Sequence, residues 1–354
     1  MNLPELEVAG AAAPKRFARG LVIGKFYPFH RGHRFLVETA VRHCAEVTVI
    51  VCDPEGQLIP AELRASWIRE MVPAARTVIA PDAHLADDDS KGWAGYTIKL
   101  LGRAPDAVFT SEDYGDKYAG FLGCAHVSVD RDRRRWPVSG TLVRRDPYAN
   151  WEWLDPPIRG YFAKRVVVVG AESTGTTTLA RDLAAHYRTA WVPEYGRTYW
   201  EGKMTARDAA VWRTEEFVHI AKMQNEMEDR LARTADRLLV CDTDSFATRL
   251  WHERYLGFMS PEVERLGAGR DADWYFLTGD EVPFVQDGTR DGEHIRHQMH
   301  ERFMEELRRQ GRSFTLLSGS REERLREAAA VCDRLLGDPK WAARAQAALS
   351  PAGR

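Results

Sequence analysis

The stretch GLVIGKFYPFHRGH, residues 20–33, decides the fold of the first half of the chain. Its apolar run Gly20–Ile23 is typical of a buried parallel strand, and it leads through a glycine-bearing turn into a helical pattern. A second run of this kind, Val166–Val169, precedes Gly170 and another helical pattern. Each stretch therefore predicts a buried strand that passes into a helix.

Further strand candidates follow both runs and alternate with helical patterns. They comprise residues 47–52 and 107–109 in the first half, and residues 237–241 and 274–277 in the second. Alternating strands and helices predict two α/β domains, each a doubly wound parallel sheet with its ligands at the carboxyl ends of the strands.

The segment Asp155-Pro156-Pro157 cannot continue a helix and precedes the second valine run, so we expect the domain boundary near residue 160. The predicted organisation is a flexible N-terminus at 1–17, a first domain at 18–160, a second domain at 161–337 and a peripheral tail at 338–354.

The composition restricts the class of protein. With 354 residues, 44% hydrophobic and 29% charged, the chain has the make-up of a globular protein of about two domains. A net charge of -2 gives no global basic field, so no nucleic-acid partner is expected. Five cysteines without CxxC spacing suit a reducing compartment, and no targeting signal or long apolar run is visible. We expect a cytoplasmic enzyme that does not insert into membranes and whose oligomeric state, including a homo-oligomer, stays open.

The residue types of the first turn point to phosphate chemistry. Gly24 allows the backbone to turn close to a phosphate, and Gly32 allows the next helix to begin there with its free N–H groups facing an anion. His30 and His33 flank the same volume, which suits a reaction whose transition state spreads negative charge over phosphoryl oxygens. Standing alone, such a His-x-Gly-His could equally be two ordinary core or surface histidines.

This segment resembles the HxGH nucleotidyltransferase superfamily, and Val138–Arg144 looks like that family's ISxTxxR signature with valine in place of isoleucine. Alone, a Ser-x-Thr before a basic residue could be a helix cap. The resemblance implies a Rossmann-like domain in which His30 and His33 contact the α- and β-phosphates of ATP, and Ser139 and Arg144 the departing pyrophosphate. The ATP-binding residues implied are Gly24, Lys25, Phe26, His30, His33, Ser111, Ser139, Thr141 and Arg144.

Three weaker features accompany this motif. Phe109–Glu112 looks like the family's adenosine-side loop. Trp93 is a candidate for stacking on a cationic nicotinamide ring, although a packing role is equally open. The basic run Arg131–Arg135 could be an anionic-substrate patch or a solvated loop.

Gly170–Thr178 has the layout of a P-loop, with GxxxxG met by Gly170 and Gly175 and with Thr177 at the position that normally reaches Mg²⁺. Thr176 stands where a lysine would meet the β- and γ-phosphates, so that charge is absent or comes from elsewhere. Without the lysine, the turn could also be only structural. The predicted nucleotide contacts are Gly170, Glu172, Ser173, Thr174, Gly175, Thr176, Thr177, Thr178, Arg290 and Arg296.

Acidic residues follow two further strands of the second half. Asp242 stands at the Walker-B position for a metal-coordinating carboxylate, so Thr177 and Asp242 are the predicted Mg²⁺ ligands. Residues 287–296 could close over the phosphates as a lid. The predicted riboside-binding residues are Glu194, Tyr195, Arg197 and Asp244.

The order P-loop, EYGR, DTD and DGxR resembles the kinase domain of the bifunctional NadR-type family, and with the first motif the resemblance covers roughly residues 18–335. Some members also begin with a helix-turn-helix domain, for which the residues before the first strand are too few here. The resemblance implies an adenylyltransferase that makes NAD from ATP and nicotinamide mononucleotide, and a kinase that phosphorylates ribosylnicotinamide, both with Mg²⁺.

Several assignments stay open at this stage. Either Glu194 or Asp242 could accept the proton of the riboside or bind the metal, and Lys203, Arg290 or Arg296 could supply the missing positive charge. One rival is an adenylyltransferase for another phosphate acceptor, such as pantetheine phosphate or a flavin mononucleotide. A second rival makes the second domain a nucleotide sensor without turnover.

Overall fold

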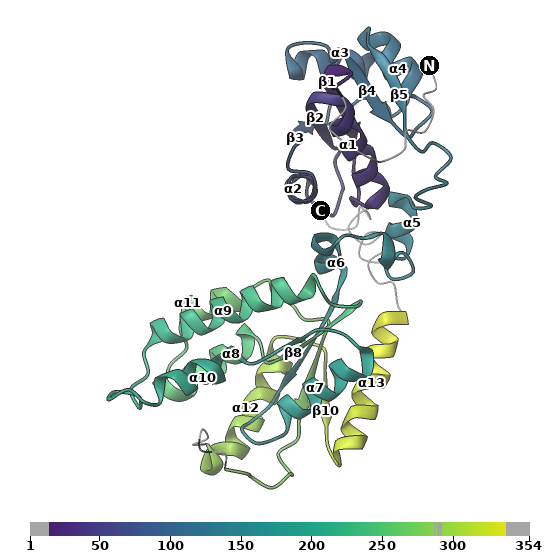
Figure 1. Cartoon of the computed structure of the whole chain (residues 1–354). Coiled ribbons are helices and arrows are strands. Elements are labelled where there is room, and N and C mark those ends of the chain that lie inside the picture. The colour runs from purple at the N-terminus through teal and green to yellow at the C-terminus, as the bar shows by residue number, and fades with distance from the viewer. Residues whose placement is uncertain (1–13, 287, 289–291, 338–354) are drawn as a thin grey trace. The chain divides into compact units, whose positions relative to one another are not determined.

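The computed structural model describes residues 14–286, 288 and 292–337 (Figure 1). The predicted tail at 338–354 and most of the predicted flexible N-terminus lie outside these residues. The contacts within the chain define two compact units, one that ends at Ile158 and one that begins at Arg159. The functions expected for the two units remain predictions.

The first unit is built on a five-stranded parallel sheet in the order β3-β2-β1-β4-β5. The chain therefore places β2 and β3 on one side of β1 and then returns to place β4 and β5 on the other. This reversal opens a crevice at the carboxyl ends of β1 and β4, where ligands of such sheets bind. The strands are β1 (Phe17–Gly24), β2 (Cys44–Asp53), β3 (Arg76–Pro81), β4 (Ala107–Thr110) and β5 (Ala125–Ser128).

Helices cover both faces of this sheet (Figure 1). The side chains of Leu21, Ile50 and Val108 form one core with the third and fourth helices, while the first and second helices pack on the opposite face. The helices are α1 (Arg31–His43), α2 (Ala61–Met71), α3 (Ser90–Leu101), α4 (Gly115–Leu122), α5 (Gly140–Arg145), η1 (Trp151–Trp153) and α6 (Pro156–Phe162).

The second unit has its own five-stranded parallel sheet, in the order β10-β9-β6-β8-β7. The valine run forms the central strand and is fully buried, as its composition predicts. The strands are β6 (Lys164–Val169), β7 (Trp191–Val192), β8 (Leu238–Asp242), β9 (Trp274–Thr278) and β10 (Phe314–Leu317). The prediction of two α/β units with all-parallel sheets is thus confirmed.

Figure 1 shows helices on both faces of this sheet as well. The helices α7 and α13 share a core with alternate residues of β6 and β8, and α9 packs on the other face. The helices are α7 (Thr176–Tyr187), α8 (Tyr195–Lys203), α9 (Thr214–Ala232), α10 (Ser245–Leu256), α11 (Pro261–Gly267), η2 (Glu293–Ile295), α12 (Arg296–Arg309) and α13 (Arg321–Gly337).

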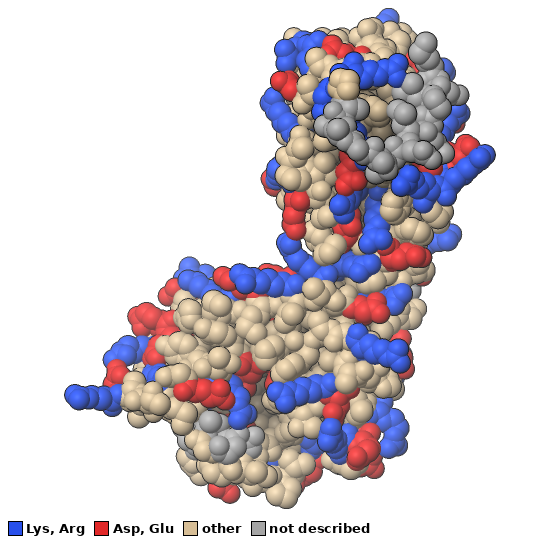
Figure 2. Space-filling view, viewed as in Figure 1, with Lys and Arg blue, Asp and Glu red and all other residues tan. Residues whose placement is uncertain are grey.

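Basic and acidic side chains are interspersed over the face shown in Figure 2, with neither sign dominating it. This mixture accords with the near-zero net charge of the sequence. Within residues 14–286, 288 and 292–337, no helix combines the length and the apolar character needed to cross a bilayer.

Candidate functional sites

The crevice at the carboxyl ends of β1 and β4 is a cavity that collects every residue predicted for the first site. The turn after β1, the loop after β4 and the start of α5 contribute to its walls. The predicted residues that line it are Gly24, Lys25, Phe26, His30, His33, Trp93, Ser111, Ser139, Thr141 and Arg144.

The two histidines of the turn form a stacked pair. His30 is the N-cap of α1, and its Nδ1 accepts a hydrogen bond from the backbone N–H of His33 at 3.3 Å. The ring centroids of His30 and His33 lie 3.7 Å apart, with 20° between the planes. A Cβ at Gly32 would lie 3.1 Å from the His30 ring, so the glycine leaves room for the imidazole to fold over the helix start.

This arrangement leaves one nitrogen of each ring for a ligand. Within the described chain, His30 Nε2 and His33 Nδ1 are buried and have no hydrogen-bond partner. Because Nδ1 of His30 accepts a bond, the neutral ring carries its proton on Nε2, which is a buried donor without an acceptor. Such an orphaned donor in a cavity fits a phosphate oxygen.

Both imidazoles are held neutral. Burial keeps the pKa of His30 well below its usual range, and the neighbouring His33 and Arg133 act in the same direction. Burial also lowers the pKa of His33 to about 3, again with help from Arg133. An anion that enters the cavity would meet the Nε2–H of neutral His30 at the turn and cationic charge on the arginines around it.

The segment Ser139–Arg144 is docked onto the same turn. Ser139 caps α5, its Oγ accepting from the Leu142 N–H at 3.2 Å, so the cap that the sequence suggested exists and also lines the cavity. Arg144 donates to the Tyr27 carbonyl at 2.5 Å and to Thr141 Oγ1 at 3.0 Å. A Cβ at Gly140 would lie 2.6 Å from that carbonyl, which requires glycine there.

The basic run at 131–135 divides between the cavity and the surface. Arg133 lines the cavity and donates to Glu112 Oε1 at 2.9 Å, another residue of the cavity wall. Arg131 pairs with Asp113 and Arg134 with Asp132, in exposed positions. The run therefore matches neither of the two alternatives fully. Of Arg131, Arg133 and Arg134, only Arg133 lines the cavity that holds the histidines.

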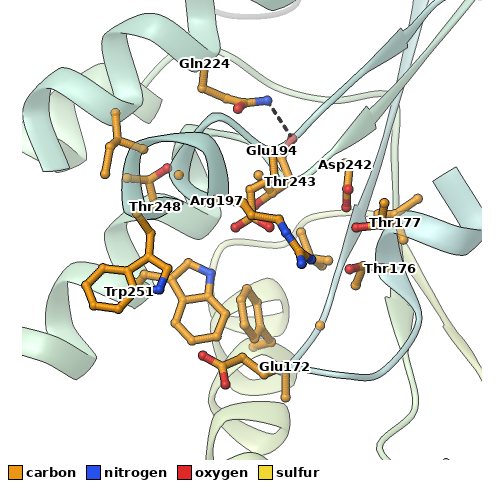
Figure 3. Close-up of a pocket in the computed structure, with 18 of the residues that line it drawn as sticks. Glu172, Thr176, Thr177, Glu194, Arg197, Gln224, Asp242, Thr243, Thr248 and Trp251 are labelled. Carbon is orange, nitrogen blue, oxygen red and sulfur yellow. Dashed lines mark hydrogen bonds between the residues drawn. The ribbon is translucent and has the colours of Figure 1, made fainter. Parts of the chain in front are cut away.

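The P-loop of the second unit forms the wall of a second cavity at the end of β6 (Figure 3). Gly175 has φ +86°, a left-handed conformation that glycine adopts without strain. The predicted residues that line this cavity are Gly170, Glu172, Ser173, Gly175, Thr176, Thr177, Thr178, Glu194, Arg197 and Asp242.

The end of β8 meets the P-loop through Asp242, which is 2% exposed. The hydroxyls of Thr177 and Thr176 lie on the same side of the cavity and act to lower the pKa of this carboxyl (Figure 3). Burial raises the pKa of Asp242 to about 6. Burial, followed by the charge of Asp242, raises the pKa of Glu194 to about 8. Figure 3 shows Glu194 between Gln224 and Arg197, close to the Asp242 side of the cavity.

These groups fit a divalent cation. Thr177 and Asp242 provide the hard oxygen donors that Mg²⁺ prefers, and burial raises the pKa of Asp242 and of Glu194. No cluster of three or more acidic, histidine or cysteine side chains that could hold a metal occurs in the described part of the chain.

Several predicted residues lie away from the second cavity. Asp244 caps α10 and accepts from the Tyr275 hydroxyl at 2.6 Å. The Tyr195 hydroxyl faces His219, at 3.1 Å from its Nε2. The Thr174 hydroxyl is bonded to Ala171 O and to Thr278 Oγ1, which ties the P-loop to β9. These side chains support the fold around the cavity. Asp244 and Tyr195, which were predicted to bind the riboside, do not line it.

Two of the cations suggested as substitutes for the missing lysine have contacts within the protein. Lys203 binds Glu216 Oε1 at 2.6 Å and the Val211 carbonyl at 2.6 Å. Arg296 donates to the carbonyl of Ser173 at 3.2 Å and so braces the P-loop. Arg290, with part of the suggested lid, lies outside the described residues.

Sequence reasoning missed an aromatic wall in the second cavity. Trp200, Trp212, Phe217, Trp251 and Tyr255 line it from α8, α9, α10 and the segment before α9. The rings of Trp212 and Tyr255 lie 5.1 Å apart. The spacing of Trp251 and Tyr255 on one face of a helix was an available signal, but the other rings come together only through the fold.

The folds and cavities define a class of protein: a chain of two α/β units, each with a glycine-bearing phosphate-type turn after its central strand. The AAA domain family model matches residues 165–324, which span the P-loop unit. The chain is 27% identical over 295 residues to the trifunctional NAD biosynthesis/regulator protein NadR of Escherichia coli, a match that covers 77% of this chain and 71% of the relative. The NadR of Salmonella typhimurium is 26% identical over 293 residues, with the same coverage of both chains.

Solved structures agree with this relationship at the level of the fold. A crystal structure of a NadR protein in complex with NR has a TM-score of 0.74 and 22% identity, covering 93% of this chain and 98% of the other. A NadR protein in complex with NAD and AMP-PNP has a TM-score of 0.71 and 22% identity, covering 91% and 97%. The resemblance to NadR-type proteins is therefore confirmed: the chain is similar to them in sequence and in fold.

Proposed function

We propose that this chain is an enzyme of NAD biosynthesis with two activities. The first unit transfers the adenylyl group of ATP to nicotinamide mononucleotide, which gives NAD and pyrophosphate. The second phosphorylates ribosylnicotinamide with ATP. The names of the relatives and the NR, NAD and AMP-PNP bound in two NadR structures support this choice of substrates.

The observation that carries the first activity is the orphaned nitrogen pair of His30 and His33 in a cavity shared with Ser139 and Arg144. In the proposed reaction, the phosphate of nicotinamide mononucleotide attacks the α-phosphorus of ATP in line, and the bond to the pyrophosphate oxygen breaks. His30 Nε2–H donates to a phosphoryl oxygen, and Arg144 faces the departing pyrophosphate. Catalysis of this kind depends on position and charge, with no covalent intermediate.

The second activity is supported by the P-loop geometry and by the carboxylate pair. The riboside's 5′-hydroxyl would attack the γ-phosphorus of ATP while Glu194 accepts its proton. Burial raises the pKa of Glu194, so its carboxylate, once it has lost its proton beside a bound cation, would be a stronger base than an exposed glutamate. Asp242 and Thr177 would hold Mg²⁺, which neutralises phosphate charge when bound.

A product assay tests the first activity. The purified chain is incubated with Mg²⁺, ATP and nicotinamide mononucleotide, and NAD and pyrophosphate are quantified by chromatography. Pantetheine phosphate and flavin mononucleotide serve as competing acceptors, and the His30→Ala variant as the inactive control. Absence of NAD, or preferred adenylylation of another acceptor, would contradict the proposal.

The lysine-free P-loop favours one alternative for the second unit: a nucleotide-binding sensor without turnover. Riboside-dependent ADP release by the wild type and by Asp242→Ala separates the two functions. Release that depends on Asp242 supports the kinase. ATP binding without release supports the sensor.

A further inference from the structure

Three polar side chains of the first unit form a hydrogen-bonded chain that the proposed reaction does not use. His126, on β5, has its Nδ1 2.8 Å from Asp116 Oδ1 on α4 and its Nε2 2.9 Å from Thr110 Oγ1 at the end of β4. The bond from His126 lowers the pKa of Asp116, so the carboxylate accepts and the Nδ1–H of the ring donates. The imidazole therefore links an exposed acid to the buried hydroxyl of Thr110.

The local sequence leaves room for this chain. In the parallel pair of β4 and β5, His126 stands beside Val108, so its side chain shares a face of the sheet with Thr110, two residues further on. A Cβ at Gly115 would collide with both His126 Nε2 and Thr110 Oγ1, so α4 has to begin with glycine for the ring to reach the hydroxyl. The contact is thus built at the carboxyl end of β4, where the first cavity lies.

Thr110 connects the chain to the wall of this cavity. Its hydroxyl lies 3.3 Å from the Glu112 carbonyl, to which it can also donate. The side chain of Glu112 in turn accepts from Arg133 Nη2 at 2.9 Å, and all three of these residues line the cavity. A hydroxyl held between an imidazole and a carbonyl restricts the loop after β4. That loop carries the carboxylate that anchors Arg133.

Arg133 is the cation to which this chain leads. Its φ of +52° lies in the left-handed region, which residues with a side chain seldom adopt, so its surroundings must hold it there. Its charge lowers the pKa of both His30 and His33, which places the guanidinium near the histidine pair. A guanidinium has five N–H donors, so the contact with Glu112 leaves others for an anion. An arginine already ordered by Glu112 also loses less entropy when a phosphate binds.

We infer that His126, acting through the Thr110 hydroxyl, is a positioning residue that holds Arg133 ready for the phosphates of a nucleoside triphosphate. His126 touches no substrate in this assignment and acts only through the loop after β4. The inference rests on the proposed function in that the first cavity binds ATP, and it does not require adenylyl transfer. A role of His126 in packing alone would change the stability of the unit but would not depend on Arg133.

Hydrogen–deuterium exchange measured by mass spectrometry tests the inference, because separate peptides report the two cavities. AMP-PNP with Mg²⁺ is titrated without an acceptor, and the protection of residues 24–33 gives the Kd of the first cavity. Residues 170–178 report the second cavity and serve as the internal control. We expect His126→Leu and Thr110→Val each to raise the Kd of the first cavity about fivefold or more, with the Kd of the second unchanged.

Two further comparisons separate positioning from packing. Thr110→Ser keeps the hydroxyl and His126→Gln keeps a polar group on the ring's side of it, so both should recover most of the affinity. Arg133→Gln should raise the Kd about tenfold or more, and His126→Leu added to it should cause little further loss, because both changes remove the same contact. In Arg134→Gln, an exposed neighbour paired with Asp132, His126→Leu should keep its full effect.

Melting temperatures establish that each variant folds. The inference is overturned if folded His126→Leu or Thr110→Val binds AMP-PNP in the first cavity as the wild type does. It is also overturned if His126→Leu causes the same loss with and without Arg133, or if AMP-PNP gives residues 24–33 of the wild type no protection.

Parallel measurement of NAD formation separates this inference from the proposed adenylyl transfer. Absence of NAD together with protection that depends on both His126 and Arg133 removes the transfer and leaves the inference standing. NAD formation by the wild type together with protection that is independent of His126 leaves the transfer and overturns the inference.

Discussion

The two units present phosphate-type turns at the same place in similar sheets, yet the charges around the turns differ: acidic and basic residues balance in the first cavity, whereas acids outnumber cations in the second. In the first unit the turn carries two neutral imidazoles, and Arg133 and Arg144 stand across the cavity. In the second the turn carries hydroxyls, and three carboxylates share the cavity with Arg197. The sheet geometry thus fixes where an anion binds, while the side chains decide what accompanies it.

The difference bears on the chemistry of each site. The first cavity offers donors and cations directly to phosphoryl oxygens, which suits attack at an α-phosphorus with pyrophosphate leaving. Among the described residues that line the second cavity, the acids Glu172, Glu194 and Asp242 outnumber the cation Arg197. In the proposed function, a metal-bound nucleotide would supply positive charge there. The predictions below test this contrast, starting with the largest effect.

His30→Asn should have the largest effect on the first site. Asparagine is a good N-cap, so the bond from the His33 N–H is kept, but the Nε2 donor is lost. We expect the kcat of NAD formation to fall by about 100- to 1000-fold, the usual cost of one transition-state donor. Steady-state kinetics measure it, with the melting temperature as the check on folding. A variant that keeps more than about a tenth of the wild-type kcat would remove His30 from the chemistry.

The Arg133→Gln variant tests whether ATP use by the first cavity depends on the positive charge of Arg133. We expect kcat/KM for ATP in NAD formation to fall by about 10- to 100-fold, since a charged hydrogen bond to phosphate is lost. Arg131→Gln is the matched control, because Arg131 belongs to the same loop but pairs with Asp113 at the surface. Equal losses in both variants would show that the loop, rather than the charge of Arg133, matters.

The central strands of both sheets were predictable because they are continuous apolar runs bounded by glycine. The strands absent from the prediction, β3, β5 and β10, all lie at sheet edges. Their residues are mostly exposed or half-buried, as in the pattern of Arg76–Pro81. An edge strand is defined by its neighbour in the sheet, which a local pattern does not show.

The candidate sites divide in a similar way. Residues within contiguous motifs, such as His30, His33 and Thr177, line the cavities where the motifs indicated. The riboside contact predicted for Asp244 stays a prediction: the backbone turns at Thr243, with φ +72°, and Asp244 caps α10. The contact of Arg133 with the cavity depends on distant segments and could not be deduced from spacing.

The Glu194→Gln variant tests whether the second cavity has too little positive charge to keep the buried carboxylate of Glu194 ionised at neutral pH. The pKa of Glu194 rises from 4.5 to about 8 on folding, so the folded state holds a proton that the unfolded chain releases between these values. Stability should therefore fall as pH rises through this window and level off above it. The glutamine variant lacks this loss, and at pH near 8.5 we expect it to melt about 3 °C or more above the wild type.

Differential scanning calorimetry without Mg²⁺ at several pH values measures this effect. Glu201→Gln, an exposed acid of the same helix, is the control and should follow the wild type. The interpretation is refuted if the melting temperature of the wild type rises from pH 5.5 to 8.5 and that of the Glu194→Gln variant changes with pH in the same way.

Trp93→Leu should give the smallest effect and sharpens the choice of acceptor in the first cavity. Trp93 lines that cavity while its Nε1–H donates to the Ala86 carbonyl at 3.0 Å, so the ring is held in place and one face is available for stacking. If that face meets a cationic nicotinamide, leucine should raise the KM for nicotinamide mononucleotide by about 3- to 10-fold with the KM for ATP unchanged. Trp93→Phe keeps an aromatic face and should recover most of the loss, whereas a packing role predicts equal changes in both KM values and no advantage of phenylalanine over leucine.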